Sequence, residues 1–338
     1  PLLEAILNAG LPYTSGPQWM SENILQGRHV LAVAGTHGKT TTTSMIAHVF
    51  EGIKGINYLI GDGRGAAKRE NEFFVLESCE YCRHFLVYEP DYAIITNIDL
   101  DHVDYFKDMQ DVIDAYQEYA NKAEKMVIAC GDDPYTRMLD VNKPLFFYGI
   151  GEDNDIVAKN VEYTSKGTTF DVFVEENYYG HFDLPIFGKH MVLNALAVIG
   201  FCYYERFDAK EVARNIKSFN GASRRFTEEF IGSNVIVDDY AHHPQEVKMT
   251  IKAAKQKYPD KKIVTVFGCP GGKAQLRRRD LGLLSGKNSF MTYLTAEDPG
   301  PEETIDICKE IAQYVYQEHG NYQIIEDRGE AIKKAILE

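Results

Sequence analysis

Cysteine and long apolar runs are scarce in this 338-residue sequence, and basic residues are outnumbered by acidic ones. Six cysteines are too few for a disulfide scaffold in a chain of this length, so a reducing cytoplasm is the expected location. No run of about 18 apolar residues is present, and no membrane insertion is expected. Lysine and arginine number 36 against 50 acidic residues, a net charge of −14, which argues against nucleic acid as a partner. The net charge does not exclude a local basic pocket for one phosphorylated small molecule.

The pattern of apolar runs predicts an α/β fold in about two domains. Strands are expected over residues 29–34, 73–77, 92–97 and 125–129, with a helix over 41–50, which indicates a mostly parallel sheet. Residues 155–185 alternate apolar and polar side chains, as an antiparallel ribbon does, and helices are expected over 192–205 and 209–218. The pattern restarts with strands over 235–240, 262–268 and 290–295 and helices over 244–257 and 301–316. We therefore expect a domain boundary near residues 222–230.

A glycine-rich turn joins the first predicted strand to the first predicted helix. It consists of Gly35, Thr36, His37, Gly38, Lys39, Thr40 and Thr41. The glycines would let backbone N–H groups face phosphates, Lys39 would contact the β- and γ-phosphates, and the Thr40 hydroxyl could bind Mg²⁺. Val33 stands where the full motif has glycine, so this is a shortened variant. A tight turn with an incidental lysine is the alternative, but the position between strand and helix favours a nucleotide site.

Acidic and imidazole side chains follow two other predicted strands. Glu77 ends one strand and Glu80 comes soon after it, and the segment after the next strand contains Asp99, Asp101, His102 and Asp104. The carboxyl ends of parallel strands meet at one edge of a sheet, so these groups are expected beside the glycine-rich turn. Mg²⁺ prefers oxygen ligands. Any one of these residues could instead be a solvated loop charge or a helix cap, and their joint placement favours a metal site.

Further polar residues lie at the boundary and in the second domain. Arg224 and Arg225 are either a phosphate clamp or a solvated pair. Asp239, His242 and His243 are either residues that close over the nucleotide or local groups, with Asp239 capping the helix that begins at Pro244.

Two shorter patterns carry less information. The run Arg277–Arg279 marks either an anion site or a solvated helix start. Cys79 and Cys82 form one C-x-x-C pattern, which we interpret as two ordinary thiols rather than a zinc or redox site.

In this order the motifs resemble those of the Mur ligases, ATP-dependent enzymes that build the peptidoglycan precursor one amino acid at a time. The similarity runs along nearly the whole chain. It rests on GTHGKTTTT (35–43), ESCEY (77–81), TNIDLDHVDYF (96–106), FGKHMVLNALA (187–197), GASRRF (221–226) and DDYAHHP (238–244).

The resemblance implies a central P-loop ATPase domain over residues 29–222, with a mostly parallel sheet, and a C-terminal Rossmann-like α/β domain over residues 223–338. Residues 1–28 would be the remnant after a missing N-terminal UDP-binding domain, and the C-terminal domain would be truncated. ATP would be held by residues 35–41, with His190 and Asn194 at the adenine and Arg225 and Asp239 reaching the nucleotide. Thr40, Glu77 and His102 would bind Mg²⁺, and the catalytic residues would be Lys39, Arg225 and His102.

The implied reaction joins an amino acid, with L-alanine expected, to UDP-N-acetylmuramic acid through an acyl phosphate, giving ADP and phosphate. The C-terminal domain is more similar to the family members that add the third amino acid, through FGCPGGKAQLRRRDLG (267–282). Residues 297–300 read EDPG where those members read diaminopimelate with an arginine, which argues against that substrate. The alternatives are a ligase that adds another amino acid or a recycled peptide to a UDP-muramoyl acceptor, and an inactive nucleotide-binding paralogue. Lys122 could correspond to a carbamoylated lysine of some members.

Overall fold

The computed structural model describes residues 2–222, 224–272 and 275–337, and the chain forms two compact units. The first comprises the residues up to Asn160, together with Phe170–Phe182 and Leu193–Phe219. The second comprises Val161–Thr169, Asp183–Val192 and the residues from Asn220 onward. Ser223 of the GASRRF motif, and residues 273–274 of the glycine-rich segment at 267–282, lie outside the described residues.

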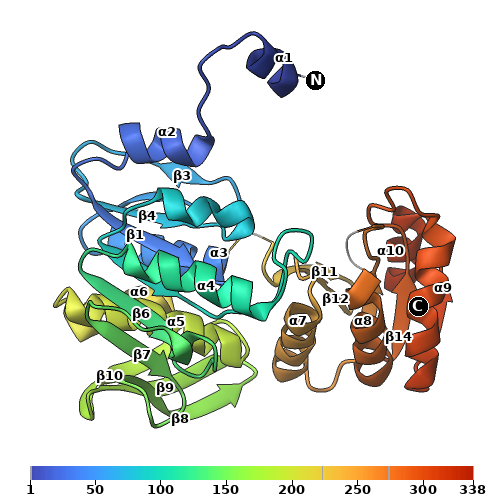
Figure 1. The fold of residues 1–338 in the computed structure, drawn as a ribbon. Coiled ribbons are helices and arrows are strands. Elements are labelled where there is room, and N and C mark those ends of the chain that lie inside the picture. The colour runs from blue at the N-terminus through green and yellow to red at the C-terminus, as the bar shows by residue number, and fades with distance from the viewer. Residues whose placement is uncertain (1, 223, 273–274, 338) are drawn as a thin grey trace. The chain divides into compact units, whose positions relative to one another are not determined.

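A ten-stranded sheet forms the centre of the first unit (Figure 1). Its order is β10-β9-β8-β7-β6-β5-β1-β4-β2-β3, and the pairs from β2 through β4, β1, β5, β6 and β7 to β8 are parallel. Two-residue connections join β8 to β9 and β9 to β10, and only antiparallel neighbours can be joined so tightly. The strands are β1 (His29–Ala34), β2 (Asn57–Leu59), β3 (Gly65–Ala66), β4 (Phe73–Glu77), β5 (Tyr92–Ile95), β6 (Met126–Cys130), β7 (Leu145–Gly149), β8 (Ile156–Thr164), β9 (Gly167–Val174) and β10 (Asn177–Leu184).

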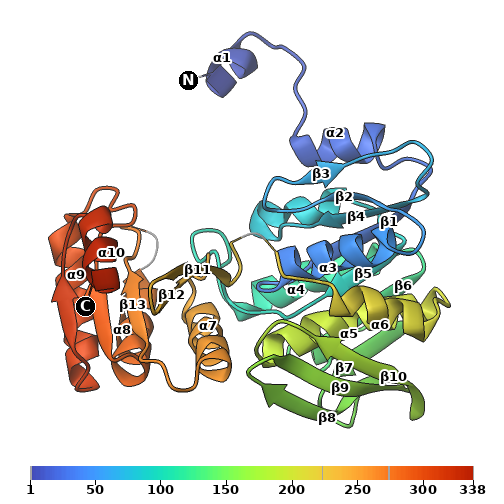
Figure 2. The same cartoon turned by 180° about the vertical axis from the view of Figure 1, so that it is seen from behind.

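Helices cover both faces of this sheet, with α4 in front in Figure 1 and α3 and α6 in front in Figure 2. Five of the six β1 residues are buried, because a parallel strand covered on both faces must be apolar throughout. The helical elements are α1 (Leu2–Asn8), α2 (Gly16–Asn23), α3 (Lys39–Glu51), the 3₁₀ segment η1 (Tyr81–Val87), α4 (Met109–Asn121), the 3₁₀ segment η2 (Thr136–Met138), α5 (Lys189–Tyr204) and α6 (Ala209–Lys217). The predicted α/β class and mostly parallel sheet are confirmed.

The second unit contains a parallel sheet in the order β13-β14-β15 and a separate antiparallel pair, β11 and β12. The predicted strand at 235–240 is therefore not part of the parallel sheet. Val235 and Val237 instead form antiparallel pairs with Phe230 and Glu228. The elements are β11 (Thr227–Ile231), β12 (Asn234–Asp238), α7 (Pro244–Lys257), β13 (Val264–Phe267), α8 (Gln275–Asn288), β14 (Met291–Leu294), α9 (Thr304–Gln317), β15 (Tyr322–Ile324) and α10 (Arg328–Leu337).

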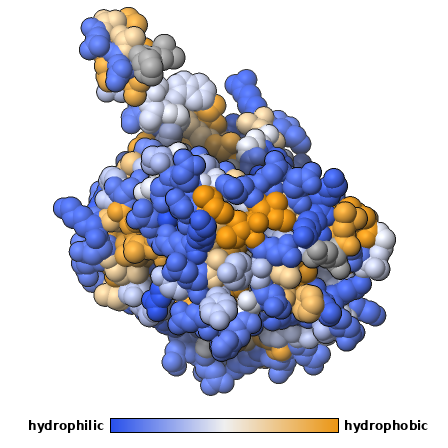
Figure 3. All heavy atoms as spheres, turned by 90° about the vertical axis from the view of Figure 1, so that its right-hand side faces the viewer, coloured by the Kyte–Doolittle hydropathy of each residue, from blue (hydrophilic) through white to orange (hydrophobic). Residues whose placement is uncertain are grey.

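The view in Figure 3 is mostly hydrophilic, with small apolar patches scattered over it. None of the helices in the described part of the chain is both long and apolar enough to cross a bilayer.

Candidate phosphate-binding site

The glycine-rich turn lies at the carboxyl edge of the large sheet, between β1 and α3. Gly38 precedes the first residue of α3 and has φ 89°, a left-handed conformation that side chains rarely adopt. A Cβ atom on Gly38 would lie 2.7 Å from the Asn194 side-chain oxygen, and one on Gly35 would lie 1.9 Å from the Thr96 hydroxyl. Both positions therefore require glycine. Because Gly38 has no side chain to cap α3, the positive end of this helix faces the turn.

The segment after β5 holds the turn in place. The His37 N–H donates to Asn97 Oδ1 at 2.9 Å, and Asn97 Nδ2 donates back to the His37 carbonyl at 2.8 Å. The Asp99 N–H donates to the Thr36 hydroxyl at 2.8 Å. These bonds preorganise the turn before any ligand arrives. Asn97 was not among the predicted residues, although an amide directly after a buried strand at this edge is a signal that could have indicated it.

Lys39 lies within the turn and forms an ion pair with Glu80. Its Nζ is 2.9 Å from Glu80 Oε2, and only 13% of the Lys39 side chain and 4% of the Glu80 side chain are exposed. Lys39 also donates to the carbonyl oxygens of Gly35 and Thr36. Burial disfavours the charged amine, but the Glu80 carboxylate outweighs this effect and raises the pKa of Lys39. The amine is therefore a fixed positive charge at the helix start.

Thr40, Glu77 and Glu80 place three oxygen-bearing side chains beside Lys39. The Thr40 hydroxyl donates to Glu77 Oε2 at 2.9 Å, and the Gly61 N–H donates to the same oxygen at 2.9 Å. His102 lies with its Nε2 3.7 Å from Glu80 Oε1. Hydroxyl and carboxylate oxygens, as on Thr40 and Glu77, are the kind of ligand that Mg²⁺ prefers. Of the three predicted metal ligands, Thr40 therefore contacts Glu77, and His102 lies beside Glu80, which the resemblance had not included among them.

The other acidic residues near His102 have local partners. Asp101 accepts the His102 N–H at 2.7 Å, and Asp99 accepts the N–H of Leu100 at 2.8 Å. Asp104 accepts the Tyr81 hydroxyl at 2.9 Å, which raises the pKa of Tyr81 to about 12. They support the loop that carries His102.

In the second unit, His190, Arg225 and Asp239 line one cavity of about 240 Å³. Burial lowers the pKa of His190 to about 4, so its ring is neutral at pH 7. Burial also raises the pKa of Asp239, whose two oxygens accept the N–H groups of Phe226 at 2.9 Å and Ala241 at 2.8 Å. The cavity thus combines a neutral imidazole, a guanidinium and a carboxyl group in a partly apolar wall.

The alternative role of Asp239 as a helix cap is wrong. His243 is the N-cap of α7, and Glu246 completes a reciprocal capping box with it. His242 contacts the same glutamate, with Nδ1 3.5 Å from Glu246 Oε2. The pair of histidines therefore serves the start of α7, while Asp239 faces the cavity.

Three other predicted positions are structural or lie elsewhere. Arg278 is neither an anion site nor a solvated helix start, because it is 2% exposed and pairs with Glu302 and Glu310 at 2.8 and 2.6 Å. Arg224 makes an exposed pair with Asp238 at 3.5 Å. Lys122 follows α4 and precedes β6, so it lies at the amino edge of the sheet, away from the turn.

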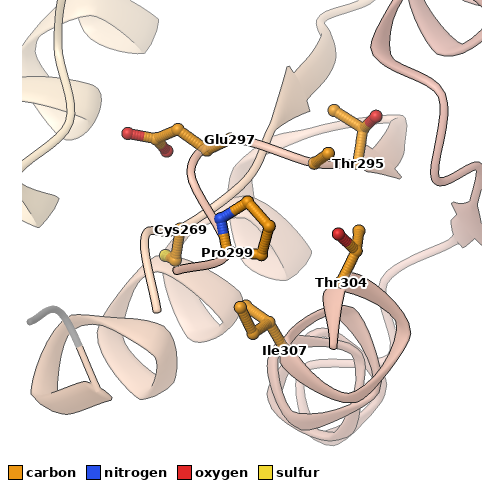
Figure 4. A pocket seen from close by; sticks show the side chains of 7 residues that line it. Cys269, Thr295, Glu297, Pro299, Thr304 and Ile307 are labelled. Carbon is orange, nitrogen blue, oxygen red and sulfur yellow. The ribbon is translucent and has the colours of Figure 1, made fainter. Parts of the chain in front are cut away.

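The thiols and a second pocket contribute no site. Cys79 and Cys82 are exposed free thiols, as interpreted. Figure 4 shows a small pocket in which Pro299 lies in the middle and the Glu297 carboxylate points away. Its lining residues are Cys269, Thr295, Ala296, Glu297, Pro299, Thr304 and Ile307. It has no space that even a water molecule can enter. Burial raises the pKa of the Cys269 thiol to about 12, so that thiol is inert.

Comparison with known proteins gives two family matches and several similar structures. Residues 33–202 match the Mur ligase middle domain, and residues 224–338 match the Mur ligase, glutamate ligase domain. The ligase MPL from Neisseria meningitides, which joins UDP-N-acetylmuramate and L-alanyl-gamma-D-glutamyl-meso-diaminopimelate, is 31% identical with a TM-score of 0.59, covering 66% of this chain and 76% of that one.

Two further structures are similar over almost the whole chain. UDP-N-acetylmuramate-alanine ligase MurC from Thermotoga maritima is 23% identical with a TM-score of 0.80, covering 97% of this chain and 74% of its own. A murein peptide ligase from Psychrobacter arcticus 273-4 is 24% identical with a TM-score of 0.71, covering 98% of this chain and 76% of its own. At these identities the two structures establish the fold.

Proposed function

This chain belongs to the Mur ligase family of ATP-dependent ligases of peptidoglycan precursor synthesis, and we propose that it joins an amine to the carboxyl group of UDP-N-acetylmuramic acid. The observation that carries the proposal is the group formed by Lys39, Thr40, Glu77 and Glu80 at the start of α3. This acceptor is common to the ligases from N. meningitides and T. maritima named above.

ATP would be bound by residues 35–41, whose left-handed Gly38 opens the start of α3 to phosphate oxygens. Lys39 would neutralise charge on the β- and γ-phosphates. We assign the adenine to His190 and Asn194, because burial keeps the His190 ring neutral and so suited to a base. Arg225 and Asp239 would reach the nucleotide as well. Asn194, which limits the space at Gly38, would contact the nucleotide from α5.

Mg²⁺ would be bound by Thr40, Glu77 and His102, with Glu80 close by. The fit rests on the contact between the Thr40 hydroxyl and the Glu77 carboxylate at 2.9 Å, two oxygens of the kind this ion takes. When bound, the ion would neutralise phosphate charge and orient the γ-phosphate. Its ligands come from the turn, from the end of β4 and from the loop after β5.

The chemistry follows from the reactivity of a carboxylate. Hydroxide is too poor a leaving group for an amine to displace at neutral pH. The carboxylate oxygen therefore attacks the γ-phosphorus, the bond to the ADP oxygen breaks, and an acyl phosphate forms. The amine then attacks the acyl carbon, inorganic phosphate leaves, and the nitrogen loses a proton. Lys39 and Arg225 would offset charge in the first step.

The amine donor is L-alanine in our first assignment. The sequence of the central domain, with ESCEY and TNIDLDHVDYF, is the reason for this choice. A peptide donor is the second candidate, because the structure at 31% identity is a ligase for a tripeptide. Both donors present a free amino group to the same acyl phosphate.

Product analysis separates the two donors. The full-length natural protein would be incubated with ATP, Mg²⁺, UDP-N-acetylmuramic acid and either L-alanine or the tripeptide. Mass spectrometry would identify the products. We expect the L-alanyl product. A product formed only from the tripeptide would replace the first assignment with the second, and no product from either would contradict the proposed acceptor.

A further inference from the structure

The Lys39 amine has no free hydrogen-bond donor. Its ammonium group has three N–H donors, and three groups accept them: the Gly35 carbonyl, the Thr36 carbonyl at 3.2 Å and the Glu80 carboxylate. Both carboxylate oxygens lie close, at 2.9 and 3.2 Å. Lys39 therefore points back into its own turn, and a phosphate oxygen can reach the amine only by replacing one of these partners.

Glu80 is the partner that differs chemically from the others. The two carbonyls belong to the turn itself, whereas Glu80 arrives from the segment after β4 and carries a full negative charge like that of a phosphate. The contact is almost completely shielded from water, since only 4% of the Glu80 side chain is exposed. A carboxylate and a phosphate therefore compete for the same buried amine.

We propose that Glu80 is a positioning residue that holds Lys39 in the nucleotide-free protein and is displaced from it by the phosphates. This inference rests on the proposed function, because it requires a nucleotide at the turn. Glu80 keeps a polar neighbour after displacement, since His102 Nε2 is 3.7 Å from its other oxygen. The ion pair between Lys39 and Glu80 thus selects among ligands, because only one with enough negative charge to replace the Glu80 carboxylate can reach the Lys39 amine.

Removing the negative charge of Glu80 should increase the affinity of the protein for ADP. In Glu80→Gln the competitor is a neutral amide, so less interaction is lost when Lys39 turns to a phosphate. A hydrogen bond to a charged group contributes about 1.5–3 kcal/mol, so we expect ADP to bind roughly tenfold to hundredfold more tightly. Glu80→Asp keeps the charge but shortens the side chain by one methylene, and its affinity should lie between those of the wild type and Glu80→Gln.

The measurement is the affinity for ADP in the presence of EDTA, by calorimetry with the full-length protein. Omitting Mg²⁺ separates the contact with Lys39 from any effect of Glu80 on a metal ion. Asp91→Asn is the matched control: Asp91 pairs with Lys125 at 2.7 Å, but it precedes β5 and so lies at the other edge of the sheet. Its affinity for ADP should equal that of the wild type.

Equal or weaker ADP binding by Glu80→Gln would overturn the proposal, because Glu80 would then not compete with phosphate. If Glu80→Gln fails to fold, the Glu80→Asp affinity decides in the same way. A wild type that binds no ADP at all would overturn the nucleotide site itself, which distinguishes failure of the proposed function from failure of this inference.

Discussion

Replacing Gly38 by alanine tests the geometry of the glycine-rich turn, and the chain offers a matched control. Gly38 and Gly63 both have φ 89°. A Cβ atom on Gly38 would lie 2.7 Å from Asn194 Oδ1, whereas nothing lies within 4 Å of one on Gly63. Comparing the two alanine variants therefore separates backbone strain from the close approach of Asn194.

The expected cost follows from these two terms. A left-handed conformation costs a residue with a side chain about 1–2 kcal/mol, which is the whole expected loss of stability for Gly63→Ala. Gly38→Ala adds an overpacking term of about 1–3 kcal/mol, because Asn194 is only 6% exposed and has little room to move. We expect Gly38→Ala to lose about 2–5 kcal/mol and most of its ADP binding, and Gly63→Ala to keep its ADP binding.

Urea denaturation followed by circular dichroism would give the stabilities, and calorimetry would give the ADP affinities. The double variant Gly38→Ala/Asn194→Ala should recover part of the lost stability, because the colliding oxygen is gone. The reasoning is refuted if Gly38→Ala is as stable as Gly63→Ala and binds ADP like the wild type.

Three further changes test other parts of the structure. Burial lowers the pKa of His190 from 6.5 to about 4, so stability should fall as the pH decreases from 6.5 toward 4, and His190→Gln should lack this part of the pH dependence in urea midpoints. Thr40→Val should lower ATP turnover about a hundredfold at saturating Mg²⁺, whereas Thr43→Val, whose buried hydroxyl has no partner among the described residues, should retain turnover and stability. Arg278→Met should lower the thermal midpoint clearly more than Arg279→Met, because only the first of these arginines is buried; equal midpoints would contradict that role.

The glycine-rich turn could be predicted from the sequence because it is a local structure. A buried strand, a glycine-rich turn and a helix follow one another directly, and the turn needs no distant partner to be identified. The contact between Lys39 and Glu80 joins residues 41 positions apart. The backbone also kinks just after Glu80, where Cys82 and Arg83 have φ of 51° and 55°. The periodicity of apolar residues in the sequence does not predict such a kink.

The second unit was harder to predict, and α8 shows why. Gly282 and Gly286 lie inside this helix, where glycine is disfavoured by about 1 kcal/mol each, so propensity indicates it poorly. A Cβ atom at these positions would lie 2.6 Å from the Ile311 carbonyl oxygen and 2.7 Å from that of Val315, both in α9. The glycines are needed for close helix packing. The same packing decides that Arg278 faces inward, which the run of three arginines alone does not show.

The central claim is that Lys39 and its neighbours activate a carboxylate with ATP. The most direct measurement is phosphate release from ATP by the full-length protein, with and without UDP-N-acetylmuramic acid and L-alanine, compared with Lys39→Ala. We predict release that requires both the acceptor and an amine and that is lost in Lys39→Ala. Release that ignores the acceptor, or that continues without the Lys39 amine, would contradict the account.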